Sequence, residues 1–315
     1  MEKDRKGGEA VDQTKAILIA VGKIILAFLF AFILTLVAMI PVVIVIAIMS
    51  GGGAGTDFTL DMLLSDPTFT YGSMIAQAAG FLAAVPIMYG LFERRKGWTI
   101  GWRMNRAAFA DLARGMGIGV VLMAAIFVLM LAAGVIRIDS IRTDAAVWAD
   151  MAAYLLLFAL VALNEELFSR GYVQGLIGYR FGTGAAIICS SLFFSLLHAF
   201  NPGALEQPVP LLNIFIAGVL LAVCREVSGT LWLPIGLHFT WNYVQGNVFG
   251  FEVSGTKVVS PLQITAEGSP LWSGGSFGAE GSLIATAVML AAIWYIWSKR
   301  KRRLQEQEPC SPQGE

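Results

Sequence analysis

The sequence NEELFSRGY, residues 164–172, ends an apolar run that begins at Met151. That run has the length and composition of a membrane-spanning helix, yet it closes on two adjacent carboxylates and an arginine, Glu165, Glu166 and Arg170. An ionisable group at bilayer depth costs at least about 2–3 kcal/mol. Three such groups within six residues therefore predict a polar site inside a membrane protein.

The composition of the whole chain is that of a membrane protein. Of its 315 residues, 57% are hydrophobic and 14% are charged, whereas a soluble domain has about 45–50% apolar and about 25% charged residues. The three cysteines, Cys189, Cys224 and Cys310, are widely spaced and form no CxxC pair. We therefore predict neither a disulfide framework nor a cysteine zinc site. The first apolar stretch, from about residue 16 to residue 49, is too long for a cleavable signal peptide.

The apolar segments predict an all-α, polytopic membrane protein of about eight transmembrane helices. A helix of about 20 residues crosses the bilayer, and lipid requires that its backbone groups be paired internally. We place the helices at about residues 24–49, 71–92, 116–136, 151–179, 183–200, 211–223, 231–249 and 283–297.

The distribution of basic residues predicts the orientation of these helices. Six basic residues lie between Arg94 and Arg114, and KRKRR follows the last apolar segment at residues 299–303. The loop at residues 51–70, in contrast, has three aspartates and no lysine or arginine. By the positive-inside rule, both termini are cytosolic in a multi-pass protein of the cell membrane.

Glu165 and Glu166 are predicted to have different roles, because neighbouring residues on a helix point about 100° apart. Glu166 and Arg170 are four residues apart and lie within ion-pair reach on one face. We interpret that pair as structural support. Glu165 then faces elsewhere, and a carboxylate that lines a cavity suits the role of general base. The alternative is that all three side chains lie solvated at the cytosolic interface.

The two histidines of the chain both fall in later apolar segments. His198 stands in FFSLLHAF, four residues after Phe194, and His238 stands in LPIGLHFTWN, four residues before Asn242. An imidazole and a carboxamide on one helical face can donate hydrogen bonds to an oxyanion or bind a metal. The alternative is that these side chains only hold helices together through hydrogen bonds.

Other protease chemistries have little support from local motifs in this chain. The sequence contains no HExxH, and its one GxSxG match, at residues 274–278, lies in a Gly/Ser-rich loop and not between a strand and a helix, where a serine nucleophile elbow would lie. A zinc-binding helix of the soluble metalloprotease type is therefore excluded, and nucleophilic serine or cysteine catalysis is unsupported.

Three ordered motifs carry a resemblance to a known family. Glu165-Glu166-x-x-x-Arg170, Phe194-x-x-x-His198 and His238-x-x-x-Asn242 follow one another across late apolar segments. In this they resemble the CPBP family, which comprises the CAAX prenyl endopeptidases of the second type and prokaryotic relatives also called Abi proteins. The resemblance covers about residues 150–250 and implies a membrane-embedded endopeptidase with an intramembrane catalytic cavity.

The resemblance also implies a role for each motif. Glu165 and His198 would activate a water molecule for attack on a peptide carbonyl. His238 and Asn242 would stabilise the resulting oxyanion, which is usually a large catalytic effect. The Glu166–Arg170 pair would hold the architecture.

These motifs are compatible with two alternatives: an enzyme without a cofactor, or one that binds a divalent metal such as zinc. In the metalloprotease alternative, Glu165, His198 and His238 would supply three ligands and water the fourth. The implied partners are the lipid bilayer and a membrane-associated peptide or protein substrate, prenylated or not, with no nucleic acid.

On this interpretation the chain divides into five parts. They are a polar cytosolic tail without regular structure (1–15), N-terminal transmembrane helices (16–149), the catalytic core (150–250), an extracytosolic loop with the last transmembrane helix (251–298) and a basic cytosolic tail (299–315).

The proposed core carries one geometric condition. Counted along the predicted helices, Glu165 lies nearer the cytosolic side and His198 nearer the outer side. They meet only if the helix of Glu165 runs on past Gly171, or if the next helix begins after Thr183.

Two other function classes fit part of the pattern. A proton-coupled transporter would use Glu165, Arg170 and His198 as a relay, but we find no related halves of the kind that build such transporters. A non-catalytic membrane scaffold would keep the protease fold without turnover.

Overall fold

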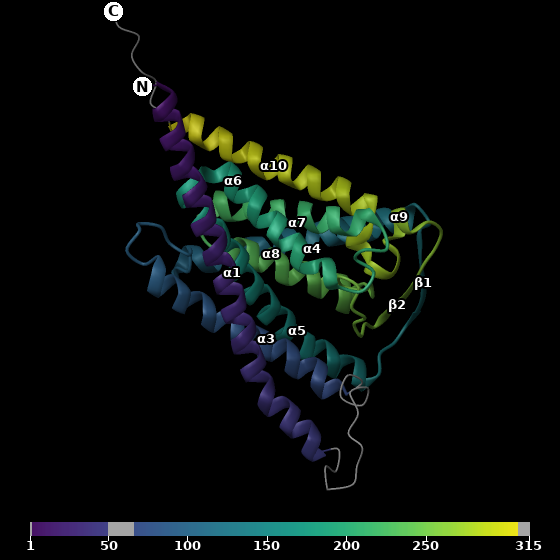
Figure 1. Ribbon diagram of the computed structural model, residues 1–315. Coiled ribbons are helices and arrows are strands. Elements are labelled where there is room, and N and C mark those ends of the chain that lie inside the picture. Colours follow the sequence, from purple (N-terminus) through teal and green to yellow (C-terminus); the bar gives the residue numbers. More distant parts are fainter. Residues whose placement is uncertain (1, 50–65, 308–315) are drawn as a thin grey trace, which may run out of the picture. The chain divides into compact units, whose positions relative to one another are not determined.

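The computed structural model describes residues 2–49 and 66–307 and shows a helical chain with one pair of strands (Figure 1). Residues 51–65 of the loop predicted at residues 51–70, and residues 308–315 of the predicted basic tail, lie outside the described residues. In chain order the elements are α1 Glu2–Met49, α3 Pro67–Phe92, α4 Arg106–Ala132, β1 Ile136–Ile141, α5 Ala145–Glu166, η1 Leu167–Val173, α6 Gln174–Leu197, η2 His198–Phe200, α7 Pro208–Ser228, α8 Trp232–Tyr243, η3 Val244–Val248, β2 Leu262–Ala266, α9 Pro270–Ser273, η4 Gly275–Phe277, η5 Ala279–Gly281 and α10 Leu283–Gln307.

The prediction of an all-α polytopic membrane protein is confirmed. Five of the described helical stretches are long and apolar enough to cross a membrane, namely Asp12–Met49, Thr68–Phe92, Arg106–Ala132, Ala145–Phe200 and Pro208–Ser228. The apolar helix Leu283–Lys299 is shorter, and α8 has only 12 residues before the π-helix η3 continues it. The number of eight transmembrane helices therefore stays a prediction.

The helical stretch Ala145–Phe200 contains the two features on which a meeting of Glu165 and His198 was predicted to depend. The helix of Glu165 does run on past Gly171, because the π-helix η1 joins α5 to α6. Gly182 has φ 84° and ψ 170°, which is non-helical and breaks α6 just before Thr183. Only glycine adopts such a backbone conformation without strain.

Two expectations for the loops and the tail were wrong. Helix α1 begins at Glu2, so residues 2–15 are helical and continue the first apolar helix. Two predicted loops contain strands, and β1 pairs with β2 in antiparallel register from Ile136–Ala266 to Ile141–Leu262. Strand pairing across more than 120 residues leaves no local sequence signal, because each strand is short and only one of their residues, Ile136, is fully buried.

The chain folds into two compact units. Unit 1 consists of Met1–Ile100 with Leu155–Ala186, and unit 2 consists of Gly101–Tyr154 with Ile187–Glu315.

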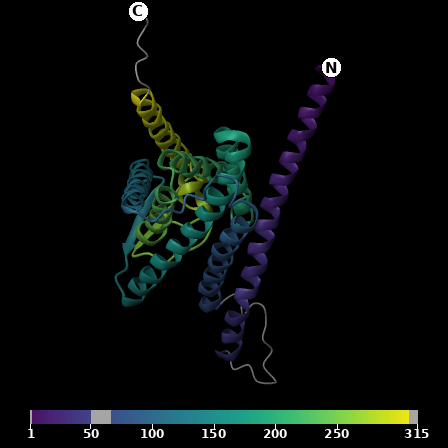
Figure 2. The same cartoon turned by 90° about the vertical axis from the view of Figure 1, so that its left-hand side faces the viewer.

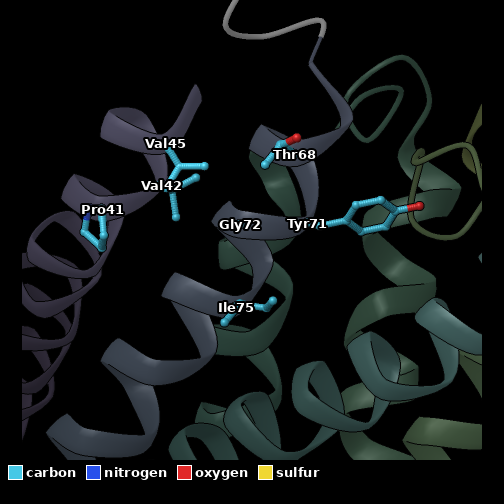
Figure 3. A pocket seen from close by; sticks show the side chains of 7 residues that line it. All are labelled: Pro41, Val42, Val45, Thr68, Tyr71, Gly72 and Ile75. Carbon is cyan, nitrogen blue, oxygen red and sulfur yellow. The ribbon is translucent and has the colours of Figure 1, made fainter. Parts of the chain in front are cut away.

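In unit 1, α1 lies beside α3 and extends beyond it (Figure 2). The helices approach so closely that a Cβ built on Gly80 would lie 2.7 Å from the backbone nitrogen of Thr35. An open, largely apolar groove of about 510 Å³ runs between them, with Pro41 and Val42 on one side and Tyr71 on the other (Figure 3). None of the predicted site residues lines this groove.

In unit 2, α8 packs against α4 through small residues. A Cβ on Gly115 would lie 2.1 Å from the carbonyl oxygen of Leu233, and one on Gly236 would lie 2.2 Å from that of Leu112. One helical turn further on, Gly119 faces Thr240. Small residues spaced four apart on both helices are a packing device of membrane proteins. Helix α4 therefore fixes α8, which carries His238 and Asn242.

This close contact gives a prediction with a control on the same helix. Gly115→Ala is expected to destabilise the protein by about 1–3 kcal/mol, because backbone on the partner helix cannot move aside at low cost. Gly117→Ala, where nothing lies within 4 Å of the added Cβ, should change the free energy of unfolding by less than about 1 kcal/mol. Equal stability of the two variants in detergent unfolding would contradict this packing.

Candidate active site

The carboxylates of NEELFSRGY stand at a change of helix type. Glu165 and Glu166 are the last residues of α5, and the π-helix η1 begins directly after them at Leu167. A π-helix inserts an extra residue per turn, costs stability and is frequent at functional sites. The sequence does not predict this π-helix, because the residues of η1 are common in ordinary α-helices and in membrane spans.

Glu166 and Arg170 form the ion pair that their spacing predicted. Arg170 Nη1 donates to Glu166 Oε1 at 2.8 Å, and both side chains have no exposed surface. Glu165 is half-buried instead. The alternative of three solvated side chains at an interface is thus wrong for Glu166 and Arg170. The division between a buried pair and a more accessible Glu165 is present in the structure.

Aromatic side chains from three elements surround η1 within unit 1. The ring of Phe168 packs edge-on against Phe81 of α3, with centroids 5.1 Å apart, and against Phe28 of α1 at 6.4 Å. On the next turn, the ring centroid of Tyr172 lies 6.3 Å from that of Trp98. Helices α1 and α3 therefore support the segment that carries Glu165, a contribution that the sequence did not reveal.

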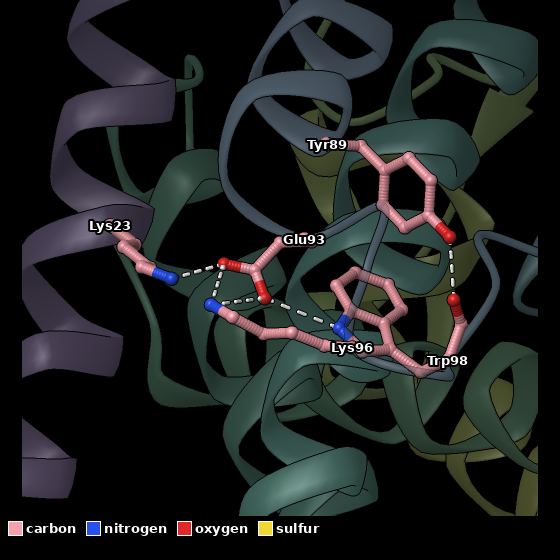
Figure 4. A network of polar contacts seen from close by, with 5 residues as sticks. All are labelled: Lys23, Tyr89, Glu93, Lys96 and Trp98. Carbon is pink, nitrogen blue, oxygen red and sulfur yellow. Dashed lines mark hydrogen bonds and ion pairs between the residues drawn. The ribbon is translucent and has the colours of Figure 1, made fainter.

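A buried polar network connects Trp98 to Glu93, Lys96 and Lys23 (Figure 4). The carboxylate of Glu93, which has no exposed surface, accepts from Lys23, from Lys96 Nζ at 3.2 Å and from Trp98 Nε1 at 3.3 Å. Burial by itself raises the pKa of Glu93, but these hydrogen bonds and charges outweigh it and hold the pKa below its ordinary value. Tyr89 donates to the carbonyl oxygen of Trp98 at 2.5 Å. A glutamate at the end of an apolar segment was the available signal for this network.

His198 lies in η2, directly after α6, in unit 2. Its Nδ1 lies 2.9 Å from the carbonyl oxygen of Phe194. Because a carbonyl oxygen only accepts, Nδ1 is the donor in this contact, and in the neutral ring Nε2 then carries the lone pair. A histidine held in this way can take a proton at Nε2 or bind a metal there.

His238 and Asn242 both lie in α8, at the helical spacing that the sequence predicted, and both are buried. The π-helix η3 begins two residues after Asn242, at Val244. Phe194 connects the two histidines, since its ring lies 4.5 Å from the ring of His198 and 6.0 Å, edge-on, from that of His238. Within unit 2 the structure therefore groups both histidines around one phenylalanine.

Glu165 belongs to unit 1, and His198, His238 and Asn242 belong to unit 2. In the part of the chain that the structure describes, no three His, Cys, Asp or Glu side chains gather as a set of metal ligands. The metal set of Glu165, His198 and His238 draws on both units, so it stays a prediction, as do the catalytic roles.

The comparison with known families bears on this segment of the chain. A family model described as type II CAAX prenyl endopeptidase Rce1-like matches residues 146–244. The chain carries a CPBP-family domain. The matched residues include all three motifs, from Glu165 to Asn242. No curated protein matches the chain.

The CPBP domain sets the general class of the protein. At the level of the family it supports a CAAX-type endopeptidase embedded in the membrane, a protease and therefore a hydrolase. The apolar helices and this membrane-embedded family support a location in a lipid bilayer.

Proposed function

We propose that this protein is an intramembrane endopeptidase of the cell membrane, with both termini cytosolic, that hydrolyses a peptide bond of a membrane-associated substrate. Prenylated peptides with a CAAX-type C-terminus are the first substrate class to test. One observation carries the proposal: the matched segment 146–244 contains Glu165, His198 and the His238–Asn242 pair in the family's order. The buried Glu166–Arg170 pair beside Glu165 supports it, because it explains the other two charges without catalysis.

In the proposed reaction, Glu165 and His198 act on one water molecule. Glu165, the base, removes a proton from the water. The oxygen of that water then attacks the carbonyl carbon of the scissile peptide bond. His238 and Asn242 donate hydrogen bonds to the oxyanion that forms on the carbonyl oxygen. The proton then passes to the leaving amine as the C–N bond breaks. The Nδ1–carbonyl hydrogen bond of His198 suits this role, since it leaves the Nε2 lone pair for the proton.

A divalent metal such as zinc is the alternative means of activating the same water. Bound by Glu165, His198 and His238, it would lower the pKa of the water to about 7. The donor set of one carboxylate and two imidazoles has the chemistry of catalytic zinc sites, and His238 would then serve as a ligand instead of a hydrogen-bond donor.

Proteolysis by reconstituted protein tests the proposal. Wild-type protein in liposomes is expected to cleave a prenylated CAAX-type peptide, and His198→Ala is expected to lower kcat by about 10²–10⁴-fold. A strong chelator should leave the rate unchanged if Glu165 and His198 activate the water without a metal. It should abolish cleavage, with recovery on adding zinc, if a metal is required.

The controls separate the substrate question from the mechanism. The same peptide without its prenyl group tests whether the lipid is recognised, and Gly117→Ala controls for handling of a variant membrane protein. No turnover of any membrane-associated peptide by wild-type protein would contradict the proposal and favour a scaffold. Ion-dependent uptake without peptide turnover would favour a transporter.

A further inference from the structure

A buried carboxylate that the three motifs do not include lies in unit 2. Glu280, in η5, is 5% exposed and lies outside the family-matched segment, which ends at residue 244. An ionised carboxylate so far from water is costly unless donors surround it. The surroundings of Glu280 provide those donors.

Three hydrogen bonds converge on the Glu280 carboxylate. Its Oε1 accepts from the backbone nitrogen and from the hydroxyl of Ser254, both at 2.6 Å. Its Oε2 accepts from Trp241 Nε1 at 3.3 Å. Ser254 has φ 48°, and among the described residues it is the only non-glycine with positive φ. Such a conformation costs about 1–3 kcal/mol and persists only where the surroundings hold it.

The backbone around Glu280 is anchored to two long helices. Asn213 of α7 donates from Nδ2 to the carbonyl oxygens of Glu280 and Ser282, both at 2.7 Å. Thr286 of α10 donates to Asn213 Oδ1 at 2.6 Å. Gly278, with φ 98°, passes so close to Glu252 that a Cβ would lie 1.9 Å from its carbonyl oxygen. The segment around η5 is therefore held in one place.

This segment reaches the candidate site by two contacts. Phe277 packs in a buried cluster with Phe194, the residue whose ring contacts both histidines. Glu280 hydrogen-bonds Trp241, which lies in α8 between His238 and Asn242. Burial raises the pKa of the Glu280 carboxyl, and the hydrogen bonds from Ser254 and Trp241 oppose that rise.

We propose that Glu280 is a positioning residue: by accepting the Trp241 hydrogen bond from an anchored loop, it fixes α8 and so the placement of His238 and Asn242. This inference rests on the proposed function for its effect on catalysis. Gly119 and Gly236 fix the same helix from the side of α4, so α8 is held from two directions. Outer residues that orient catalytic groups typically contribute about 10- to 100-fold to activity.

The test is a double-mutant cycle on the same cleavage assay. In Glu280→Gln an amide nitrogen, which is a donor, replaces one of the two accepting oxygens. It then faces another donor, either the Trp241 indole or the Ser254 backbone nitrogen. Trp241→Phe removes the indole donor and keeps a ring. Each variant is expected to lower kcat by about 10- to 100-fold with KM nearly unchanged. The double variant should lose little more than the worse single one, because both changes break one contact.

Glu267→Gln is the matched control, since Glu267 lies in the same segment but is exposed and pairs with Arg137 at the surface. It should leave kcat and KM unchanged. Rates are compared per folded protein after size-exclusion chromatography, so that a purely structural role would lower yield without changing kcat. An unchanged kcat for Glu280→Gln, or fully additive losses in the cycle, would overturn the inference.

Hydrogen–deuterium exchange makes the inference independent of activity. Glu280→Gln should raise exchange across residues 232–248, and Glu267→Gln should not. Unchanged exchange there would overturn the positioning role. A wild-type protein that cleaves nothing would overturn the proposed function instead, and exchange alone would then decide whether Glu280 fixes α8.

Discussion

Glu165→Gln is expected to lower kcat for peptide cleavage by about 10²–10⁴-fold while leaving the stability of the protein intact. Glutamine keeps the size and polarity of the side chain but cannot take a proton from water. Glu165 is only half-buried, whereas the side chains of Glu166 and Arg170 have no exposed surface. The loss should therefore fall on the chemical step, with KM within a factor of about three, because ground-state binding is retained.

The measurement is steady-state cleavage of a fluorogenic prenylated peptide in liposomes, beside detergent unfolding of the same preparations. Glu267→Gln serves as a neutral carboxylate replacement, since surface ion pairs such as Glu267–Arg137 contribute about 0–1 kcal/mol. A Glu165→Gln enzyme with wild-type kcat would refute the assignment of the base. If its loss of rate were matched by a loss of folded protein, Glu165 would be a structural residue.

The helices were predictable because lipid leaves the chain little choice. Each apolar segment must pair its backbone groups internally, so every predicted transmembrane segment lies at least partly in a described helix. What the sequence left undecided is where a helix changes type. No residue near Glu166 marks a change of helix type, yet η1 follows it, whereas the break at Gly182 falls between the two helices predicted at residues 151–179 and 183–200.

The composition of the candidate site was more predictable than its support. A charge or an imidazole in an apolar segment is conspicuous, so Glu165, His198 and His238 stood out from sequence alone. Their supports are ordinary residues whose significance depends on tertiary contacts. Phe168 matters because Phe28 and Phe81 pack against it, and Gly115 because α8 approaches it. Glu280 lies some 40 residues beyond the last motif, in a segment that was predicted to be a loop.

Removing Arg170 is expected to be the most damaging change to stability in the catalytic core. Arg170→Met should lower the free energy of unfolding by about 3–5 kcal/mol, because it leaves the Glu166 carboxylate buried without its cation. Arg170 and Glu166 have no exposed surface, so water cannot replace the lost partner. We expect reduced yield and a lower midpoint in unfolding by SDS in mixed micelles.

The double variant Glu166→Leu, Arg170→Met distinguishes a buried charge from lost packing. With both charges gone, the desolvation cost disappears, and replacement of such a pair by apolar residues of similar size is often neutral or stabilising. The double variant should therefore recover most of the stability that Arg170→Met loses. Because Glu165 and the His238–Asn242 pair are unchanged, the double variant should also recover cleavage, provided that η1 remains a π-helix. A double variant as unstable as Arg170→Met would mean that Arg170 acts mainly through other contacts. A stable double variant without activity would give the Glu166–Arg170 pair a role in catalysis beyond support.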